Sequence, residues 1–381
     1  MSPSCFSDET NNGEEKQQKV EVSFLHGNSY VDNNAIKQLK QTARLPGMVK
    51  CVGMPDLHPG GKRYPVGAAF LSRIIYPELV GGDIGCGMSL WKLDLKADLS
   101  DHQLQILASK LSNLSKRGQD MVRKEAQEFT KNASSTFQSL LKKHDHELGS
   151  IGGGNHFAEL QVVVSGAERF SKHTCYLLVH SGSRLLGNEV LDDFRNDKDV
   201  FAYKRKHDLA VKWARENREQ IARYFVDHAN CKKVEKVLDI CHNCVVEKNG
   251  AYLHRKGAAP TDCGLVAIPG SRGTFTYIVE PVDDVSIQEA CGWSVAHGAG
   301  RLLSRKDIQD QLVKKYACKG NGESELSRTA FGGYVVYEDL KILYQEAPEA
   351  YKDIDDIIVD LESTGVVRVV AKLKPLVTCK L

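Results

Sequence analysis

The sequence has no long hydrophobic run and no excess of charge of either sign. Its apolar stretches fall short of the roughly 18 to 20 residues that a membrane helix needs, and its first twenty residues are polar rather than signal-like. Lys and Arg total 51 against 49 Asp and Glu, so the net charge is only +2. We therefore expect a cytoplasmic protein, with a nuclear location not excluded, without a membrane segment, and with a nucleic-acid surface only as a local patch.

Two further patterns are missing. The phosphate-binding motif GxxxxGK[ST] does not occur, which excludes a Walker-type nucleotide loop. The 11 cysteines are an odd number and lack the regular spacing of a disulfide framework. Free thiols, with a metal ligand among them, are the better interpretation.

The composition is that of a globular protein, with 41% hydrophobic and 26% charged residues in a chain of 381. Residues 1–19 are rich in Glu, Asn and Ser and predict a disordered tail. Residues 20–381 show neither an internal repeat nor a linker. They predict one interwoven domain of the mixed α/β class.

Helical patterns occur in three stretches. Residues 32–43 predict a helix with Asp32 as its N-cap, and residues 203–247 predict a further helical region. Residues 101–148 predict a helical pair with Asp101 as an N-cap. One side of this pair carries Leu104, Leu107, Leu111 and Leu114.

Strand and turn patterns fill much of the rest. Residues 49–95 predict short strands and turns, and residues 175–180 an apolar strand. Residues 264–279 predict strands around a glycine turn, and residues 366–377 a closing pair of strands. Residues 287–304 predict a loop that enters a helix.

Side chains capable of chemistry gather in five short glycine-rich segments. Glycine allows the backbone angles and the close ligand approach that a site on a tight turn requires. The segments are MPDLHPGGKRYPVG (54–67), VGGDIGCGM (80–88), GGGNHFAE (152–159), VHSGSRLLG (179–187) and HGAGRLLSR (297–305).

Asp83 and Cys86 stand three residues apart in the second segment. From this spacing a carboxylate and a thiolate can converge on one divalent first-row ion, although an Asx-turn beside a buried cysteine fits the pair as well. His156, His180 and His242 fall at predicted turns or strand ends and favour the metal site. If oxygen and sulfur both bridge, the set holds two ions, an arrangement suited to phosphoryl or nucleotidyl transfer.

His297 is the candidate nucleophile. A neutral imidazole can attack phosphorus and form a labile phosphoramidate; the alternative is a helix-terminal histidine with no chemical role. Phosphates could be held by backbone N–H groups of PGSRGT (269–274) and by charges at Arg184, Arg301, Arg305 and Lys380. Cys241 and Cys244 form a single CxxC pair, which leaves a zinc site as an alternative.

Six motifs resemble, in this order, those of the RtcB family of RNA-splicing ligases. They are DIGCGM, GGGNHF, HSGSR, HRKGA, PGSRGT and HGAGRLLSR, within residues 49–380. The resemblance implies an RtcB-like catalytic domain with central β-sheets around a metal site and with surface helices.

The resemblance also implies an RNA ligase that uses GTP and two Mn²⁺ ions. Such enzymes join RNA ends bearing a 2′,3′-cyclic phosphate or a 3′-phosphate to 5′-hydroxyl ends. The cyclic phosphate is opened to a 3′-phosphate, and GTP guanylylates a histidine. GMP then passes to the RNA 3′-phosphate, and the 5′-hydroxyl attacks and expels GMP.

Site residues follow from the matching motifs. The resemblance places the guanylylated histidine at His297, and the metal ligands at Asp83, Cys86, His156, His180 and His242. It places the guanine-nucleotide contacts at Asn155, His156, Phe157, Ala158, Glu159, His242, Asn243, Pro269, Gly270, Ser271, Arg272, Thr276, His297, Gly298, Ala299, Gly300, Tyr351 and Lys380. Arg184 and Arg305 match positions suited to RNA phosphates.

The chain departs from the usual family pattern in several places. Arg272 stands where relatives usually have Met, Leu185 where they have Gly, and Leu381 follows Lys380 in place of the common Gly. None of these changes removes a ligand or the nucleophile. They indicate a divergent branch that resembles the RNA repair members encoded beside an alternative release factor.

Two other functions fit the same residues. One is a metal-dependent phosphoesterase that opens cyclic phosphates without joining ends, and the other is a catalytically silent RNA-binding relative. RNA contacts could come from Lys204, Arg205 and Lys206 or from Lys232, Lys233 and Lys236, although such charge runs are usually solvated faces. An archease-like activating partner is implied only by analogy with relatives.

Overall fold

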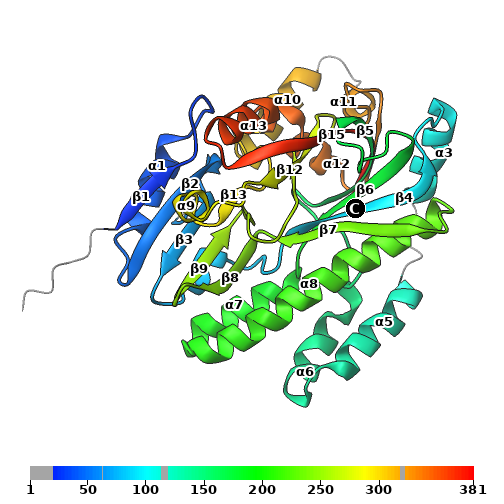
Figure 1. Ribbon diagram of the computed structural model, residues 1–381. Coiled ribbons are helices and arrows are strands. Elements are labelled where there is room, and N and C mark those ends of the chain that lie inside the picture. Colours follow the sequence, from blue (N-terminus) through cyan, green and yellow to red (C-terminus); the bar gives the residue numbers. More distant parts are fainter. Residues whose placement is uncertain (1–19, 62, 113–118, 318–321) are drawn as a thin grey trace, which may run out of the picture.

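The computed structural model describes residues 20–61, 63–112, 119–317 and 322–381 (Figure 1). The predicted tail over residues 1–19, and Leu114 of the predicted leucine row, lie outside these ranges. The described residues form helices and strands in alternation, which confirms the mixed α/β class.

A mixed sheet lies toward the N-terminal end of the described chain (Figure 1). Its strands, in spatial order, are β1 (Glu21–Phe24), β2 (Met48–His58), β3 (Val66–Ser72), β9 (Ala251–Lys256) and β8 (Asn243–Lys248). β1 runs parallel to β2, and the other neighbours are antiparallel. Strands from the start and the middle of the sequence thus pair in one layer.

The larger sheet curls across the molecule (Figure 1). Its strands, in spatial order, are β11 (Val266–Pro269), β12 (Thr276–Pro281), β15 (Val367–Lys380), β5 (Phe157–Gly166), β6 (Thr174–Ser181), β4 (Gly87–Lys96) and β7 (Val234–Cys241). β14 (Tyr334–Tyr337) runs parallel to β15, and a separate antiparallel ribbon joins β10 (Ala258–Pro260) to β13 (Ser294–Ala296). β15 is therefore an interior strand, with β12 on one side and β5 on the other.

Helices surround these sheets. The helices of the first two thirds of the chain are α1 (Asn33–Thr42), α2 (Pro77–Val80), α3 (Asp101–Leu111), α5 (Gln119–Asn132), α6 (Ser135–His144), η1 (Asp145–Glu147), α7 (Leu185–Asp197) and α8 (Val200–His228). The later ones are α9 (Val285–Ala290), α10 (Arg305–Ala317), α11 (Gly322–Leu326), α12 (Leu340–Gln345), η2 (Pro348–Ala350) and α13 (Ile354–Ser363). Over the described ranges, no helix combines the length and the apolar character that crossing a membrane requires.

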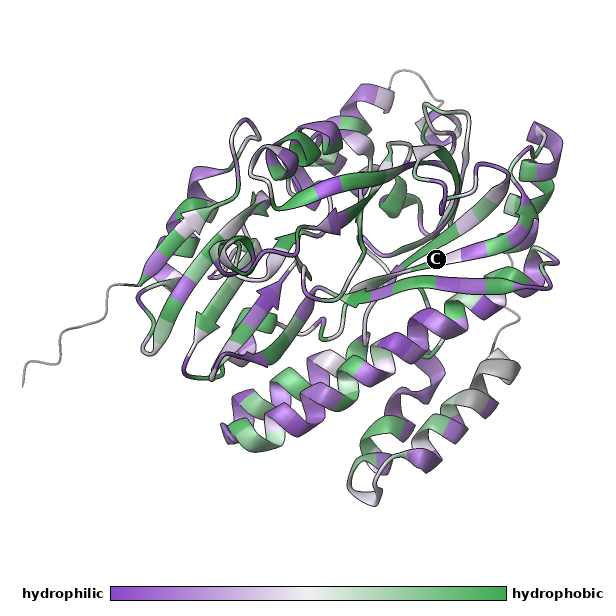
Figure 2. Ribbon diagram, viewed as in Figure 1, coloured by the Kyte–Doolittle hydropathy of each residue, from purple (hydrophilic) through white to green (hydrophobic). Residues whose placement is uncertain are grey.

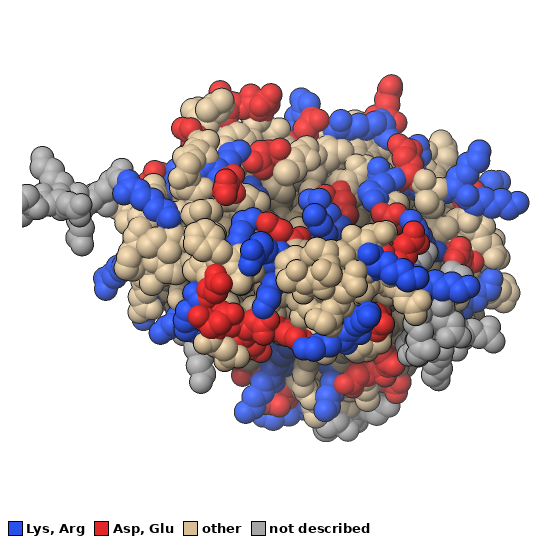
Figure 3. All heavy atoms as spheres, turned by 90° about the horizontal axis from the view of Figure 1, so that it is seen from below, with Lys and Arg blue, Asp and Glu red and all other residues tan. Residues whose placement is uncertain are grey.

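The long helix α8 packs against the larger sheet through one face. Ile221 and Phe225 are buried in the same cluster as residues of β4 and β6, whereas Phe201 is exposed to solvent. Figure 2 shows the matching mixture of hydrophobic and hydrophilic residues along this helix. The ion pair Lys204–Asp208 lies along α8, and Lys206–Asp193 links α8 to α7. Figure 3 shows acidic and basic side chains interspersed over the face seen from below.

The register of the larger sheet brings several strand ends together. Gly87 at the start of β4 faces Ser181 at the end of β6 and Cys241 at the end of β7. Phe157 at the start of β5 faces His180, and the last residues of β15 reach Ala158. Because neighbours are antiparallel, alternate starts and ends meet at one edge of the sheet.

Several predicted elements are confirmed. The helix predicted over residues 32–43 is α1, and the Asp32 carboxylate accepts a hydrogen bond from the backbone N–H of Asn34 at 2.7 Å. The strand over residues 175–180 is β6, and the glycine-turn strands over residues 264–279 are β11 and β12.

Two helix predictions are wrong in part. Asp101 is not the N-cap of α3, because the Ser100 hydroxyl accepts from the backbone N–H of Gln103, whose side chain returns to Ser100 in a capping box. The predicted pair over residues 101–148 contains α3, α5, α6 and η1, and Leu104, Leu107 and Leu111 are buried as expected. The helix predicted over residues 203–247 ends at His228, since residues 234–248 pair as β7 and β8 with β4 and β9.

Two predictions nearer the C-terminal end are also wrong, the second of them only in part. The closing strand pair over residues 366–377 is the single strand β15, in which register shifts beside Leu373 and Pro375 bend the strand without a turn. The stretch predicted over residues 287–304 as a loop that enters a helix does lead into α10 at Arg305, but it also contains most of α9 and the strand β13.

Candidate active site and metal centre

Five predicted ligands converge at the edge where the strand ends of the larger sheet meet. Asp83 and Cys86 precede β4, and His156 precedes β5. His180 lies in β6, and His242 lies between β7 and β8. The sheet register described above therefore unites residues that are up to 159 positions apart in the sequence.

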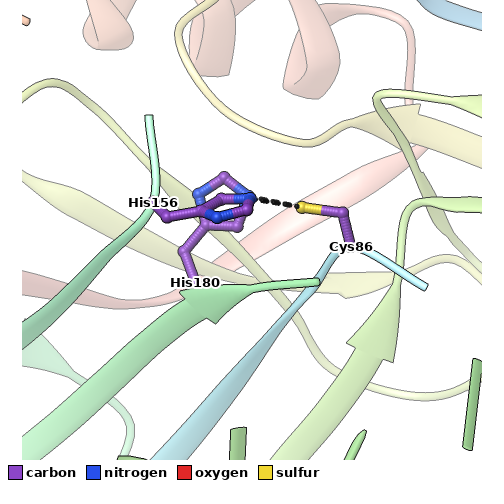
Figure 4. A group of neighbouring side chains, drawn as sticks. All are labelled: Cys86, His156 and His180. Carbon is purple, nitrogen blue, oxygen red and sulfur yellow. Dashed lines mark hydrogen bonds between the residues drawn. The ribbon is translucent and has the colours of Figure 1, made fainter. Parts of the chain in front are cut away.

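Cys86, His156 and His180 form the centre of this group, and Figure 4 shows their side chains pointing toward one another. The Cys86 Sγ lies 3.3 Å from His156 Nε2 and 3.1 Å from His180 Nε2. One ligand atom from each residue lies within 4.8 Å of the other two, and all three residues are buried. Sulfur and imidazole nitrogen in this arrangement suit a first-row divalent cation.

Asp83 and His242 extend the group at its two ends. The Asp83 Oδ2 lies 3.1 Å from His156 Nε2, and His242 Nε2 lies 3.3 Å from His180 Nε2. The Nδ1 atoms of His156 and His242 are buried and have no hydrogen-bond partner among the described residues. The donor set thus offers a carboxylate, a thiol and three imidazoles along one continuous row.

Burial sets the protonation of this row. It lowers the pKa of His180 well below the usual range, and the neighbouring His242 and His156 lower it further. It also lowers the pKa of His242, with His297 adding to the effect. Burial and then Asp83 raise the pKa of the Cys86 thiol. Both histidines are therefore neutral at neutral pH, as metal ligation requires, whereas Cys86 needs a cation to become a thiolate.

His297 follows β13 and lies beside the ligand row. Its ring centroid is 4.7 Å from that of His242. Its Nδ1 lies 2.6 Å from the Oδ2 of Asp56, and this same oxygen accepts the backbone N–H of His297 at 3.3 Å. Since the carboxylate accepts the Nδ1 proton, the lone pair of the neutral ring is on Nε2.

Asp56 was not identified from the sequence. It belongs to the glycine-rich segment 54–67, but no spacing relates it to His297, which lies 241 positions away. The residue is fully buried in β2, in the other sheet. The only available signal was its position inside one of the five segments that carry chemistry.

A pocket of about 340 Å³ opens over this edge. Most residues predicted to contact the nucleotide line it: Asn155, Phe157, Glu159, His242, Asn243, Pro269, Gly270, Ser271, Arg272, His297, Gly298, Ala299, Gly300, Tyr351 and Lys380. The structure does not bring Ala158 and Thr276 to its wall: Ala158 is buried in the core, and Thr276 lies behind Gln161. His156 lies at the base, against Cys86.

One wall of the pocket carries buried groups of opposite charge. Burial raises the pKa of Glu159 to about 7, and the Thr378 hydroxyl and the Gln161 amide donate to its carboxylate. Burial lowers the pKa of Lys380, next to this pair, to about 8. The Lys380 ammonium donates to the carbonyls of Gly154 and His156, both at 3.3 Å.

A second wall is built around Glu346, which was also missed from the sequence. The Glu346 carboxylate accepts hydrogen bonds from Arg301, from Arg305 and from the Tyr351 hydroxyl. The Arg301 guanidinium also lies over the Tyr351 ring, 5.0 Å from its centroid. These contacts hold Tyr351 and two predicted anion-binding arginines in one network.

The remaining predicted cations occupy different places. The Arg184 Nε lies 3.3 Å from the Ser150 Oγ, beside the loop that leads to His156. The buried Arg272 donates from Nη2 to the carbonyl of Leu343 at 2.7 Å. Cys241 and Cys244 are buried free thiols, and all nine cysteines of the described ranges are free. Within those ranges, Cys86, His156 and His180 are the one group in which three ligand atoms converge.

Comparison with known proteins adds to this geometry. The family described as tRNA-splicing ligase RtcB matches residues 38–199 and 196–381. RNA-splicing ligase RtcB2 of Escherichia coli is 39% identical over 373 residues, which cover 92% of this chain and 93% of that protein. tRNA-splicing ligase RtcB of Thermococcus kodakarensis is 27% identical over 468 residues, which cover 93% and 94%. The resemblance found in the six motifs is confirmed: the chain belongs to the RtcB family.

Proposed function

We propose that this protein is a GTP- and Mn²⁺-dependent RNA ligase. It joins RNA ends bearing a 2′,3′-cyclic phosphate or a 3′-phosphate to 5′-hydroxyl ends, in RNA repair or tRNA splicing. The proposal is supported by the names of its relatives, which are RNA- and tRNA-splicing ligases, and by a site that combines a ligand row with a histidine nucleophile. The observation that carries it is the Asp56–His297 contact beside that row.

The ligand row fits divalent cations. Asp83, Cys86, His156, His180 and His242 would hold the two Mn²⁺ ions, and their ligand atoms lie within 3.3 Å of their neighbours in the row. When bound, the ions neutralise triphosphate charge and orient the reacting phosphate. The buried, neutral imidazoles described above are prepared for this role without a change of protonation.

Asp56 prepares His297 for attack. By accepting the Nδ1 proton, it leaves the lone pair on Nε2 and fixes the orientation of the ring. Nε2 attacks the α-phosphorus of GTP, the new P–N bond forms, and pyrophosphate leaves as the P–O bond breaks. GMP then passes to the oxygen of the RNA 3′-phosphate, which frees His297. The 5′-hydroxyl attacks that activated phosphate, forms the phosphodiester and releases GMP.

The pocket walls provide the contacts for the nucleotide. Glu159 and Lys380 offer a carboxylate and an ammonium for the edge of the guanine base, and the Tyr351 ring offers a flat surface for it. Arg184 and Arg305 supply positive charge for RNA phosphates. The cytoplasmic location stays a prediction from the sequence composition, and the archease-like activator a prediction from the resemblance.

The test is to incubate the protein with GTP labelled at the α-phosphate and with Mn²⁺, and to measure label on the denatured chain. We expect an acid-labile adduct in the wild type and none in His297→Ala, which should still bind Mn²⁺. An adduct that persists in His297→Ala would contradict the assigned nucleophile. Opening of the cyclic phosphate without any adduct would favour a metal-dependent phosphoesterase. RNA binding without turnover would favour a catalytically silent RNA-binding relative.

A further inference from the structure

Helix α8 presents two adjacent buried polar side chains to the back of the metal centre. Asn217 and Arg218 both have no exposed surface. Neither belongs to the ligand row, to the pocket wall or to a motif that indicated function. Their hydrogen bonds reach the backbone next to the proposed metal ligands rather than the ligands themselves.

Arg218 connects the three strands that carry Cys86, His180 and His242. Its Nη1 donates to the carbonyl of Gly85 at 2.9 Å and to that of Ser181 at 3.0 Å. Gly85 directly precedes Cys86, and Ser181 directly follows His180. Its Nε and Nη2 donate to the Oδ1 of Asp239, in β7, at 3.1 and 2.6 Å.

Asn217 holds the neighbouring loops in the same way. Its amide nitrogen donates to the carbonyls of Ser150 and Gly182, at 3.1 and 3.2 Å, and to the Ser181 hydroxyl at 3.0 Å. Its amide oxygen accepts the backbone N–H of Gly149 at 2.6 Å. The loop that begins at Gly149 leads to His156, so the fourth ligand-bearing segment is tied to the same turn of α8.

We propose that Arg218 is a positioning residue that sets the cation affinity of the Cys86–His156–His180 cluster. The proposal rests on the proposed metal site. Outer contacts of this kind orient ligands, and their loss typically weakens metal binding about 10- to 100-fold. Arg218 acts through the backbone, because the two acceptors of its Nη1 are carbonyls one residue away from Cys86 and His180.

The geometry requires an arginine. The planar guanidinium directs Nη1 to two carbonyls while Nε and Nη2 bind one carboxylate. A lysine retains the charge opposite Asp239 but has a single nitrogen on a flexible stem. Arg218→Lys should therefore keep the buried ion pair and lose the fixed spacing between the strands.

The experiment is a Mn²⁺ titration of the full chain, with free Mn²⁺ followed by electron paramagnetic resonance. We expect Arg218→Lys to bind Mn²⁺ about 10- to 100-fold more weakly than the wild type. The matched control is Arg255→Lys. Arg255 is also buried and donates to the carbonyl of Trp293, to the Ser294 hydroxyl and to the carboxylate of Asp262, but it lies in β9, in the other sheet. This control should bind as the wild type does.

Activity gives a second readout. In Arg218→Lys, the Mn²⁺ concentration for half-maximal adduct formation should rise by the same factor, while the rate at saturating Mn²⁺ stays near that of the wild type. Unchanged Mn²⁺ affinity would overturn the role of Arg218, as would an equal loss in Arg255→Lys, which would indicate general destabilisation. A wild type that binds no Mn²⁺ would instead contradict the proposed metal site.

A second variant covers the case in which Arg218→Lys does not fold. Arg218→Met combined with Asp239→Asn removes both members of the buried ion pair and leaves no unpaired charge. We expect the same 10- to 100-fold loss of Mn²⁺ affinity in this double variant. Wild-type affinity in a folded double variant would overturn the inference.

Discussion

The site has two halves that are built by different means. The metal half consists of the ligand row, and the nucleophile half consists of His297 and Asp56. The ligands lie at the ends of neighbouring strands, so the hydrogen-bond register of one sheet determines their spacing. His297 instead depends on Asp56, which comes from β2 in the other sheet. The nucleophile half is thus assembled from two separate layers by side-chain contacts.

Lys352 supports the nucleophile half through hydrogen bonds on both sides of the Asp56–His297 contact. Its backbone N–H donates to the carbonyl of Gly300, in the loop after His297, at 3.0 Å. Its ammonium donates to the carbonyls of Pro55 and Leu57, on either side of Asp56, at 2.8 and 2.9 Å. One residue therefore connects both partners of the Asp56–His297 contact, through its backbone on one side and its side chain on the other. Each half has its own support, and the two should fail separately.

The largest expected effect on Mn²⁺ affinity is that of Cys86→Ala, in the metal half. Since the sulfur lies between two ligand nitrogens, Mn²⁺ affinity should fall by more than about 100-fold, beyond the loss typical of an outer contact. Adduct formation at limiting Mn²⁺ should fall with it. Calorimetric titration provides the measurement, and a wild-type isotherm for the variant would show that Cys86 is no ligand.

The largest expected effect on the rate of adduct formation is that of Asp56→Asn, in the nucleophile half. The amide NH2 group can donate to Nδ1, so the variant no longer enforces the Nδ1–H tautomer, and the rate of adduct formation should fall by about 10³- to 10⁴-fold, as for comparable carboxylate–histidine pairs. Mn²⁺ affinity should stay within twofold of the wild type. A parallel loss of Mn²⁺ binding would mean that the two halves are coupled.

The raised pKa of Glu159 predicts that the free energy of unfolding depends on pH. Because burial raises its pKa to about 7, the folded state binds more protons than the unfolded state between roughly pH 4.5 and 7. The free energy of unfolding should therefore fall as pH rises through this window, by up to about 3 kcal/mol from this group. Urea unfolding at several pH values measures it. Glu159→Gln should flatten the dependence, and an unchanged slope would exclude Glu159 as its source.

Lys352→Met should have the smallest effect of the four. It leaves the carbonyls of Pro55 and Leu57 without their donor, which should reduce the free energy of unfolding by about 1–3 kcal/mol. The rate of adduct formation should fall, whereas Mn²⁺ affinity should not change. Lys50→Met is the control, because Lys50 also donates to a backbone carbonyl, that of Glu289, but away from the site. Equal rates in the two variants would rule out a specific role for Lys352.

The two halves also differ in how far the sequence predicts them. The ligand row could be proposed because metal-ligating residue types recur beside glycines, which is a local signal. Asp56, Glu346, Arg218 and Lys352 gave no such signal, because they act through buried contacts with distant residues or with backbone carbonyls. That residues 20–381 form one interwoven domain stays a prediction.

In the fold, too, the sequence predicts the elements that local signals determine and not those that depend on distant partners. Helix α1 and the strands around the glycine turn follow from local capping and alternation, and they were predicted correctly. The helix predicted over residues 203–247 extends too far. Residues of β7 and β8 form strands because their pairing with β4 and β9 outweighs the local helical preference. The continuity of β15 depends on partners on both of its sides, which no local pattern reveals.

The interior position of β15 has a consequence for synthesis. On the ribosome, β5 is synthesised about 200 residues before β15, with which it pairs. This edge of β5 therefore has no partner while the intervening residues are translated. Until residues 367–380 emerge, β5 and β12 expose open edges, and the pocket lacks Lys380. Nascent chains interrupted before this strand should be inactive and prone to aggregation, which makes complete translation a condition for the site.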